Sequence, residues 1–336
     1  MSVYQAVLLP GDGIGPEVAR SARKVIDAAG VQIEWREMQA GVRAVENGSK
    51  PLPDQVLAAV QETGLALKGP LTTPVGSGFR SVNVELRRAL DLYANLRPVR
   101  SLPGTSDRYP DVDLVIIREN TEGLYIGDEI WENGDTVTAR RRISREGSRR
   151  IARFGFEYAR DQGRKSVTAV HKANILKESD GLFLECAREA AAGFPGLEYR
   201  ERIVDALSMD LVLDPNRHDT LLCPNLYGDI ISDLAAGLVG GLGLVPGANL
   251  GLDCAVFEAV HGSAPDIAGQ GIANPTALIL AGAMLLRQIG EGAAAARVEA
   301  GIQAVYQEGK TLTPDSGGTA STREFTRAVI QQIDRL

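Results

Sequence analysis

Two aspartates four residues apart, Asp229 and Asp233, lie in NLYGDIISDLAAGL, whose pattern predicts a helix. At this spacing both carboxylates lie on one helix face, where their like charges repel unless a cation lies between them. Carboxylate oxygens without cysteine or histidine are typical ligands of Mg²⁺ or Mn²⁺. The apolar and glycine residues around the pair indicate partial burial, which favours a metal site over a solvated helix face. A third carboxylate is needed, and Asp205 in RIVDALSMDL is a candidate that spacing alone does not select.

Three arginines form a second group of candidate ligands. Arg87, Arg97 and Arg118 fall at the expected ends of strands or helices, in SVNVELRRALDLYANLRP and VIIRENTEG. A guanidinium group holds a carboxylate through two parallel hydrogen bonds, so three of them would suit a substrate with several carboxylates. The chain contains 36 lysines and arginines, however, so spacing alone leaves a surface role open.

Lys172 and Tyr125 are candidates for proton transfer. Lys172 follows an expected strand in HKAN, where a buried lysine near a metal can have a lowered pKa and act as a base. Tyr125, in ENTEGLY, can serve as a proton donor. Either side chain can equally be structural, and the residues alone do not bring the two together.

A glycine-rich turn, GDGIGPE at 11–17, stands between an expected strand and an expected helix, as a phosphate-binding loop would require. Its G-x-G-x-G spacing is not the Rossmann fingerprint, and no convincing acidic residue follows at the end of a second strand. A plain tight turn is therefore an open alternative.

The pattern around these residues alternates short apolar runs with helical stretches, which predicts an α/β fold. Asn133-Gly134, between β-prone residues in 130–143, predicts a hairpin that reaches away from the main body as an arm. Expected strands span 3–9, 65–71, 113–120, 166–174 and 220–229, and expected helices follow the first glycine turn and span 148–162, 180–192, 277–308 and 321–336.

Composition limits the class of protein. With 336 residues, 44% of them hydrophobic, the chain is long enough for roughly two domains. The formal net charge of -7 predicts no general attraction to nucleic acid or to an anionic membrane. Cys186, Cys223 and Cys254 lack the spacing of a zinc site or a disulfide framework. The sequence shows neither a basic leader nor an apolar run of membrane-spanning length, so we expect a soluble, cytoplasmic protein.

Taken together, the motifs resemble those of the decarboxylating dehydrogenase family that includes isocitrate, isopropylmalate and homoisocitrate dehydrogenases. The resemblance covers the whole chain, with several separate motifs in one order. It is carried by LLPGDGIGPEV, LKGPLTTPVG, LRRALDLYANLRPV, LVIIRENTEGLY, TAVHKANILK, NLYGDIISDLAAGLVGGLGLVPGAN and FEAVHGSAPDIAGQGIANPTA.

The resemblance implies a particular α/β fold, which is not the Rossmann fold and which has its active site in the cleft between two domains. Residues 1–97 and 246–336 would form a discontinuous cofactor-binding domain. Residues 98–245 would form the dimerisation and substrate domain, with a β-arm near 126–145.

The same resemblance implies roles for the metal and proton-transfer candidates. Asp229 and Asp233 would hold Mg²⁺ or Mn²⁺ together with Asp205 of the partner subunit. Lys172 of the partner subunit would take the proton from the substrate hydroxyl, and Tyr125 would protonate the enolate after CO₂ leaves. A site shared between chains makes a homodimer the minimum functional unit and leaves a tetramer open.

The substrate contacts implied by the resemblance come from several segments. The carboxylates of a small 2-hydroxy acid would be bound mainly by the three arginines. The full set of substrate-binding candidates is Ser81, Asn83, Arg87, Arg97, Arg118, Tyr125, Lys172 and Asn174.

The cofactor would be held largely by the later loop HGSAPDI. Asp266 stands where NADP-linked relatives carry a lysine, and Ile267 stands where they carry a tyrosine. A carboxylate can accept a hydrogen bond from a ribose 2′-hydroxyl but repels a 2′-phosphate, so we expect NAD. The cofactor-binding candidates are Thr72, Asn83, His261, Gly262, Ser263, Ala264, Pro265, Asp266, Ile267 and Asn274.

The choice of substrate depends on the segment before Arg87. Ser81 and Asn83 match the S-x-N-x-x-L-R pattern of isocitrate enzymes, whereas isopropylmalate enzymes carry apolar residues there. Gly123-Leu124-Tyr125 instead resembles homoisocitrate relatives. We therefore expect oxidative decarboxylation of isocitrate, a step of the tricarboxylic acid cycle. The first alternative is homoisocitrate as the substrate, as in lysine biosynthesis, with or without activity on isocitrate as well. The second alternative is isopropylmalate.

Overall fold

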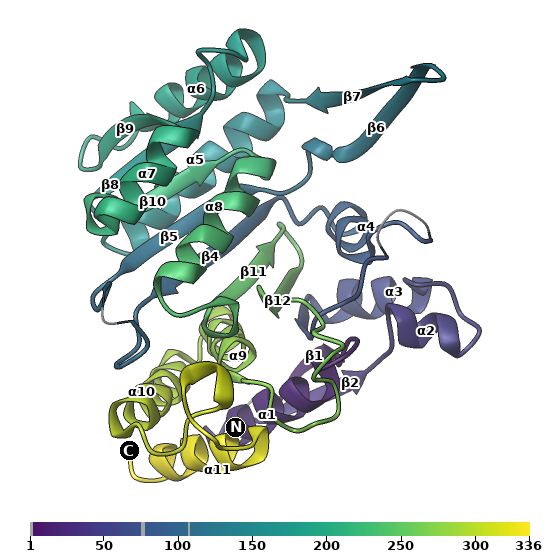
Figure 1. Ribbon diagram of the computed structural model, residues 1–336, viewed down its shortest axis with the longest axis vertical. Coiled ribbons are helices and arrows are strands. Elements are labelled where there is room, and N and C mark those ends of the chain that lie inside the picture. The colour runs from purple at the N-terminus through teal and green to yellow at the C-terminus, as the bar shows by residue number, and fades with distance from the viewer. Residues whose placement is uncertain (1–2, 75–77, 107) are drawn as a thin grey trace.

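A ten-stranded mixed sheet runs through the molecule, and helices cover both of its faces (Figure 1). The computed structural model describes residues 3–74, 78–106 and 108–336. The strands of these ranges are β1 (Tyr4–Leu9), β2 (Ile33–Glu37), β3 (Leu65–Lys68), β4 (Ala94–Arg100), β5 (Asp113–Glu119), β6 (Gly123–Asn133), β7 (Thr136–Arg142), β8 (Ser166–His171), β9 (Glu198–Ile203), β10 (Thr220–Cys223), β11 (Pro246–Leu250) and β12 (Ala255–Ala259). The α-helices are α1 (Gly15–Ala28), α2 (Val42–Glu46), α3 (Asp54–Thr63), α4 (Val82–Ala89), α5 (Arg145–Asp161), α6 (Lys177–Ala191), α7 (Val204–Leu213), α8 (Asn225–Leu238), α9 (Thr276–Gln288), α10 (Gly292–Glu308) and α11 (Thr322–Ile333).

The order of the large sheet is β2-β1-β3-β12-β11-β4-β5-β10-β8-β9. Its first four strands are parallel to one another, and so are its last four. Between these halves, β11 and β4 each pair antiparallel with both of their neighbours. The fold is therefore the mixed α/β arrangement expected from the sequence, and its strand order is not that of a Rossmann sheet.

Alternate residues of each strand face opposite layers of the molecule, as the strand period of two requires. Leu8 and Ile117 lie in one apolar core, together with residues of α1, α5, α6 and α9. Val7 lies in the opposite core with residues of α3 and α4, and Ile116 lies in a third core with residues of α7 and α8. Helices on both faces thus bury both sides of the sheet.

Several expected elements have different bounds in the structure. The strands expected over 65–71 and 166–174 end at Lys68 and His171, and two further differences are larger. The strand expected over 220–229 ends at Cys223, because Pro224 precedes the first residue of α8 and lacks the backbone donor that a strand ladder needs. The helical pattern at 277–308 forms two helices, α9 and α10, since the chain turns at Gly290 with φ of 85°. The early end of β10 leaves Asp229 and Asp233 together on α8, which confirms the helix predicted from NLYGDIISDLAAGL.

The hairpin expected around Asn133-Gly134 is present. Strands β6 and β7 pair antiparallel and project away from the main body as a two-stranded arm (Figure 1). At its tip the side chain of Asn133 accepts a hydrogen bond of 2.9 Å from the backbone N–H of Asp135. Trp131 on the arm is 68% exposed, which leaves a large apolar side chain without cover in the single chain.

The expected division into two domains stays a prediction. The boundary at residue 97 falls within β4, and the boundary at 246 falls at the start of β11, so one continuous sheet crosses both. Within the described ranges, none of the helices has the length and apolar character needed to cross a membrane.

Candidate active site

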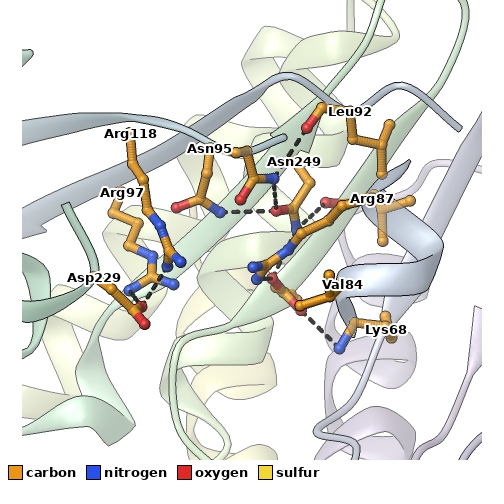
Figure 2. Close-up of polar contacts among 12 residues, drawn as sticks. Lys68, Val84, Arg87, Leu92, Asn95, Arg97, Arg118, Asp229 and Asn249 are labelled. Atoms are coloured by element: carbon orange, nitrogen blue, oxygen red, sulfur yellow. Dashed lines mark hydrogen bonds and ion pairs between the residues drawn. The ribbon is translucent and has the colours of Figure 1, made fainter. Parts of the chain in front are cut away.

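Two arginines from neighbouring strands and two aspartates from one helix meet beside the middle of the sheet. Arg118 on β5 is opposite Asn95 of β4, and Arg97 lies two residues further along β4, so both arginines leave the same face of the sheet. There they meet α8, which carries Asp229 and Asp233. Arg97 Nη1 lies 3.5 Å from Asp229 Oδ1 and 3.7 Å from Asp233 Oδ1. Arg118 also bonds the Asp229 carboxylate, and both guanidinium groups point toward it in Figure 2.

Glycine at position 228 allows α8 to approach this closely. A Cβ atom at Gly228 would lie 2.6 Å from the Cβ and Cγ atoms of Arg118. Any larger residue would therefore push the helix away from β5. The amide of Asn225, one turn earlier, accepts hydrogen bonds from Arg118 Nε at 3.0 Å and from Arg118 Nη2 at 2.7 Å. These bonds fix the plane of a guanidinium group that is only 1% exposed.

The charges of this cluster perturb each other's pKa values. Burial lowers the pKa of Arg118 to about 9, and the neighbouring Arg97 contributes to the same effect. Burial alone would raise the pKa of Asp229, but Arg118 and Arg97 outweigh it and lower that pKa. Burial raises the pKa of Asp233, and the charge of Asp229 acts in the same direction. The cluster therefore combines two buried guanidinium groups with two carboxylates whose pKa values shift in opposite directions, downward for Asp229 and upward for Asp233.

Tyr125 joins the same cluster from the arm. Its hydroxyl donates a hydrogen bond to the Asp229 carboxylate, and the Arg118 guanidinium lies 5.0 Å from the centre of its ring. Burial raises the pKa of Tyr125, and the hydrogen bond to Asp229 adds to the effect. The hydroxyl therefore keeps its proton at neutral pH, as a proton donor must.

Lys172 and Asp205 form a separate pair. Lys172 Nζ lies 2.5 Å from Asp205 Oδ1, and this hydrogen bond lowers the pKa of Asp205. No hydrogen bond or ion pair of the described residues joins either side chain to Asp229, Asp233 or Tyr125. The pair follows β8 and begins α7, so one chain brings the candidate base to Asp205 but not to the other candidates. Asn174 is exposed in the turn after Lys172.

Arg87, the third expected arginine, contacts a buried carboxylate that the sequence analysis missed. Its Nη2 lies 3.3 Å from Glu258 Oε1, and Lys68 Nζ lies 2.6 Å from the other oxygen of Glu258. Asn249 donates a hydrogen bond to Glu258 at 2.7 Å and accepts one from Asn95 at 2.8 Å (Figure 2). Glu258 is thereby connected to β4, the strand that also carries Arg97. The detectable signal was a single charge in each of two otherwise apolar strands, at the end of LALK and within AVFEA.

The start of α4 places two polar candidates near this group. Ser81 is the N-cap of α4 and accepts a hydrogen bond from the backbone N–H of Val84 at 3.5 Å. The side-chain oxygen of Asn83 is buried without a hydrogen-bond partner among the described residues. A buried amide oxygen without a partner is costly, which is consistent with a ligand that would satisfy it. Ser81 and Tyr125 line one cavity of about 880 Å³ between α4 and the start of β6.

The expected cofactor loop is tied to the glycine-rich turn at its N-terminal end. Ile14 donates its backbone N–H to the carbonyl of Ser263 at 2.9 Å, and a Cβ at Gly13 would lie 2.0 Å from that same oxygen. Thr72 donates its hydroxyl to Ser263 Oγ at 2.7 Å and its backbone N–H to Asp12 at 2.9 Å. The turn at 11–17 therefore supports the loop. Position 13 requires glycine, because the backbone of Ser263 leaves no room for a Cβ atom there.

Asp12, which the sequence analysis did not select, is the centre of that support. Its side chain is 3% exposed, and it also accepts backbone hydrogen bonds from Val42 and Arg43 at 3.2 and 3.3 Å. One carboxylate thus joins the glycine turn, the start of α2 and the segment that carries Thr72. The only sequence signal was an acidic residue within a run of glycines.

The rest of the loop differs in exposure from residue to residue. Asp266 is exposed, as are Gly262 and Pro265, whereas Ile267 is partly buried. Ala264 has an uncommon positive φ of 38°. Burial lowers the pKa of His261, which favours its neutral form, and its Nε2 atom is buried without a partner in the described part of the chain.

Asn274 is buried, and its side chain is occupied within the protein. Its amide nitrogen donates to Asp315 at 2.9 Å and to Tyr306 at 3.1 Å, and its oxygen accepts from Thr276 at 3.0 Å. These bonds position the segment around Asn274. Its expected contact with the cofactor stays a prediction.

The carboxylates fit a divalent cation only in part. Asp229 and Asp233 offer hard oxygens on consecutive turns of α8, and a cation would relieve their mutual repulsion. Among the described residues, however, no group of three or more His, Cys, Asp or Glu side chains is arranged to hold a metal. A complete donor set therefore needs a ligand from outside this arrangement, such as a second subunit.

Comparison with known proteins gives consistent similarities over the whole chain. The model of the family "Isocitrate/isopropylmalate dehydrogenase" matches residues 5–329. Catalytic subunit 5 of the mitochondrial NAD isocitrate dehydrogenase of Arabidopsis thaliana is 50% identical over 98% of this chain and 88% of its own length. A regulatory chain of the mitochondrial NAD isocitrate dehydrogenase of Dictyostelium discoideum is 45% identical over 98% of this chain and 92% of its own length.

A solved structure gives the same result for the fold. The crystal structure of isocitrate dehydrogenase from Methylococcus capsulatus has a TM-score of 0.96 and 52% identity, and the match covers 98% of this chain and 99% of that one. The names of the two eukaryotic relatives contradict the cytoplasmic location that we expected, because both proteins are mitochondrial. The expectation of a cytoplasmic protein was therefore wrong.

Proposed function

This chain belongs to the isocitrate/isopropylmalate dehydrogenase family, and we propose that it is an NAD-dependent dehydrogenase that converts isocitrate to 2-oxoglutarate and CO₂. The observation that carries the proposal is the convergence of Arg97, Arg118 and Tyr125 on Asp229. The solved relative of 52% identity is named an isocitrate dehydrogenase, which supports the same substrate.

The arginines would bind the substrate's carboxylates. Arg97 and Arg118 are held by Ser232 and Asn225 of α8 and are preorganised before any ligand binds. Glu258 orients Arg87 by accepting a hydrogen bond from its Nη2 atom, and the other guanidinium N–H groups can donate to a ligand. Three fixed guanidinium groups favour a tricarboxylate, because each can hold one carboxylate by paired hydrogen bonds.

The metal and the cofactor would supply the chemistry that side chains lack. Mg²⁺ or Mn²⁺ at Asp229 and Asp233 would act as a Lewis acid toward the substrate hydroxyl and its neighbouring carboxylate, and NAD would accept the hydride. The carboxylate of Asp266 favours NAD over NADP, since it is exposed and would repel a 2′-phosphate.

The proton transfers are assigned to Lys172 and Tyr125. Lys172 of the partner subunit would take the proton from the substrate hydroxyl, and its Asp205 neighbour would accompany it to the shared site. Tyr125 would deliver a proton to the carbon that loses CO₂, since its raised pKa keeps the hydroxyl protonated. The resulting product is a 2-keto acid.

A homodimer would complete the site. Four large apolar side chains near Lys172 and on α7 and α8 are strongly exposed in the single chain: Ile175 (68%), Met209 (54%), Leu213 (64%) and Ile230 (55%). Met209 and Leu213, four positions apart on α7, share one helix face, and an exposed apolar face is typical of a protein interface. Burying this face against a second copy would bring Lys172 and Asp205 of one chain toward the aspartates of the other. The relatives named as catalytic and regulatory subunits make an assembly of unlike chains the second candidate.

The substrate is tested by comparing kcat/KM for isocitrate, homoisocitrate and isopropylmalate with NAD and Mg²⁺ or Mn²⁺. We expect isocitrate to give the highest value and a chelator to abolish NADH formation. A preference for isopropylmalate of more than about tenfold, or about 1.4 kcal/mol, would contradict the inference from Ser81 and Asn83. Absence of turnover with all three acids would favour a regulatory role.

A further inference from the structure

A groove between α1 and α11, outside the candidate active site, collects basic side chains. It encloses a cavity of about 650 Å³, which lies within the range of about 300–1,000 Å³ for small-molecule sites. Its lining includes Arg20 and Lys24 from α1 and Arg323 and Arg327 from α11. None of the residues assigned above to substrate, metal or proton transfer lines it.

The four cations form no close ion pair within the part of the chain that the structure describes. None of them has a carboxylate oxygen within 4 Å among the described residues, although ion pairs are numerous elsewhere, as at Arg36 and Glu62. The acidic residue in the lining is Glu17, so the lining carries four formal positive charges against one negative charge. The groove is therefore locally positive on a chain whose formal net charge is -7.

The arrangement of the cations is electrostatically unfavourable without a ligand. On each helix the two basic residues are four positions apart, which places like charges next to each other on one face. The two faces then meet across one groove, so the two pairs repel each other as well. An anion between the helices would relieve both repulsions, just as a cation would relieve that between two aspartates.

Among the other lining residues, Gln270 has one amide N–H that can donate to an anion, since the other bonds a backbone carbonyl. The hydroxyls of Ser21 and Thr326 donate to backbone carbonyls of their own helices, and Ile330 is the aliphatic lining residue. Arginine binds phosphate through its planar fork, and lysine binds it as a point charge. We propose that the groove between α1 and α11 binds a small molecule that carries two phosphoryl groups, with one helix contributing to each group.

Titration calorimetry with inorganic pyrophosphate on the full chain, without divalent metal and at about 0.1 M salt, tests this proposal. We expect saturable binding of one pyrophosphate per chain, and binding of inorganic phosphate at least tenfold weaker. The double variant Arg20→Gln/Lys24→Gln and the double variant Arg323→Gln/Arg327→Gln should each weaken pyrophosphate binding at least tenfold. Both should stay folded, since they remove exposed like-charge pairs, and thermal unfolding checks this.

A matched control removes two exposed positive charges elsewhere, in Lys165→Gln/Arg335→Gln, and should leave the affinity unchanged. Pyrophosphate binding that persists in both groove variants would assign the anion to the arginines of the active site and overturn the proposal. Absence of saturable binding, equal affinities for phosphate and pyrophosphate, or an equal loss in the control variant would also overturn it.

Discussion

Lys68 and Glu258 form an ion pair of 2.6 Å in the interior, with both side chains less than 10% exposed. Burial alone would raise the pKa of Glu258, but Lys68 and Arg87 outweigh it and hold that pKa far below its usual range. A lowered pKa in the folded state means that Glu258 contributes stability above its unfolded pKa of about 4.3, and that this contribution falls as the pH drops below it. The same carboxylate contacts Arg87, the arginine that we propose for substrate binding, so its charge bears both on the stability of the sheet and on the orientation of Arg87.

The first prediction concerns this pair. Glu258→Gln should lower the free energy of unfolding at pH 7 by about 3–5 kcal/mol, because it leaves Lys68 and Arg87 buried without a counter-charge. The difference from wild type should shrink between about pH 5 and pH 3, as the unfolded wild-type chain takes up a proton on Glu258 that the folded chain does not. Urea unfolding at several pH values measures both effects. Glu62→Gln, which breaks an exposed pair with Arg36, is the control and should have little effect. A constant difference across this pH range would contradict the assigned charge state.

The second prediction concerns the fork of Arg118. Arg118→Lys keeps the charge but cannot reproduce the bonds to Asn225 and Asp229 together. We expect kcat/KM for isocitrate to fall about 10- to 100-fold, which corresponds to one lost charge-assisted hydrogen bond. The control Arg100→Lys, on an exposed position of β4, should change kcat/KM less than about twofold. Equal kinetics of Arg118→Lys and wild type would exclude Arg118 from the substrate site.

The sequence allowed the α/β class, the hairpin arm and most elements to be predicted, because apolar periodicity and turn residues are local signals. It also selected Arg97, Arg118, Tyr125 and Asp229, which the structure brings together. Contacts between residues far apart in the sequence could not be predicted in this way, because they depend on which strands become neighbours in the sheet.

Glu258 and Asp12 illustrate why those pairings were missed. A charge within an apolar strand shows that a partner must exist, but Lys68 becomes that partner only because β3 and β12 are neighbours in the sheet. Asp12 could be recognised as a support only after the chain had placed Thr72 and the start of α2 around it. Lys172 remained apart from Asp229 in one chain, since their proposed meeting depends on a second copy.

The third prediction concerns Asp12. Asp12→Asn replaces one accepting oxygen by a donor. The new NH₂ group faces either the backbone N–H groups of Thr72 and Val42, which bond Oδ2, or that of Arg43, which bonds Oδ1. The resulting shift of Thr72 and Ser263 should raise KM for NAD about 5- to 30-fold, equivalent to about 1–2 kcal/mol, with a smaller change in kcat. Initial rates at varied NAD concentrations measure the split. Asp27→Asn, a partly exposed aspartate on α1, is the control. A change in kcat alone would show that Asp12 does not act through the cofactor loop.

The fourth prediction concerns cofactor choice. Asp266→Lys combined with Ile267→Tyr should move the ratio of kcat/KM for NADP to that for NAD upward by about tenfold or more, since a cation replaces a carboxylate that repels a 2′-phosphate. Asp266 is exposed, so the exchange should leave the fold intact. Kinetics with both cofactors at fixed isocitrate provide the measurement. Asp253→Lys, in the turn between β11 and β12, is a charge-matched control outside the loop. An unchanged ratio would remove Asp266 from the cofactor site.

The fifth prediction tests whether two chains share each site. Lys172→Met and Asp229→Asn should each be inactive alone, because each lacks one proposed group of every site. After mixed refolding in equal amounts, about half of the dimers would carry one chain of each kind, and one of their two sites would contain both native groups. Activity should therefore return to about one quarter of wild type.

The contact of Lys172 with Asp205 within one chain supplies the control for this experiment. A mixture of Lys172→Met with Asp205→Asn should stay inactive, because one chain supplies both groups to a site, so no site would receive both intact. Recovery in this control, or no recovery in the first mixture although mixed dimers are detected by mass spectrometry, would contradict the shared site. In that case Lys172 and Asp229 would have to act within one chain, which would require a movement of α7 or α8.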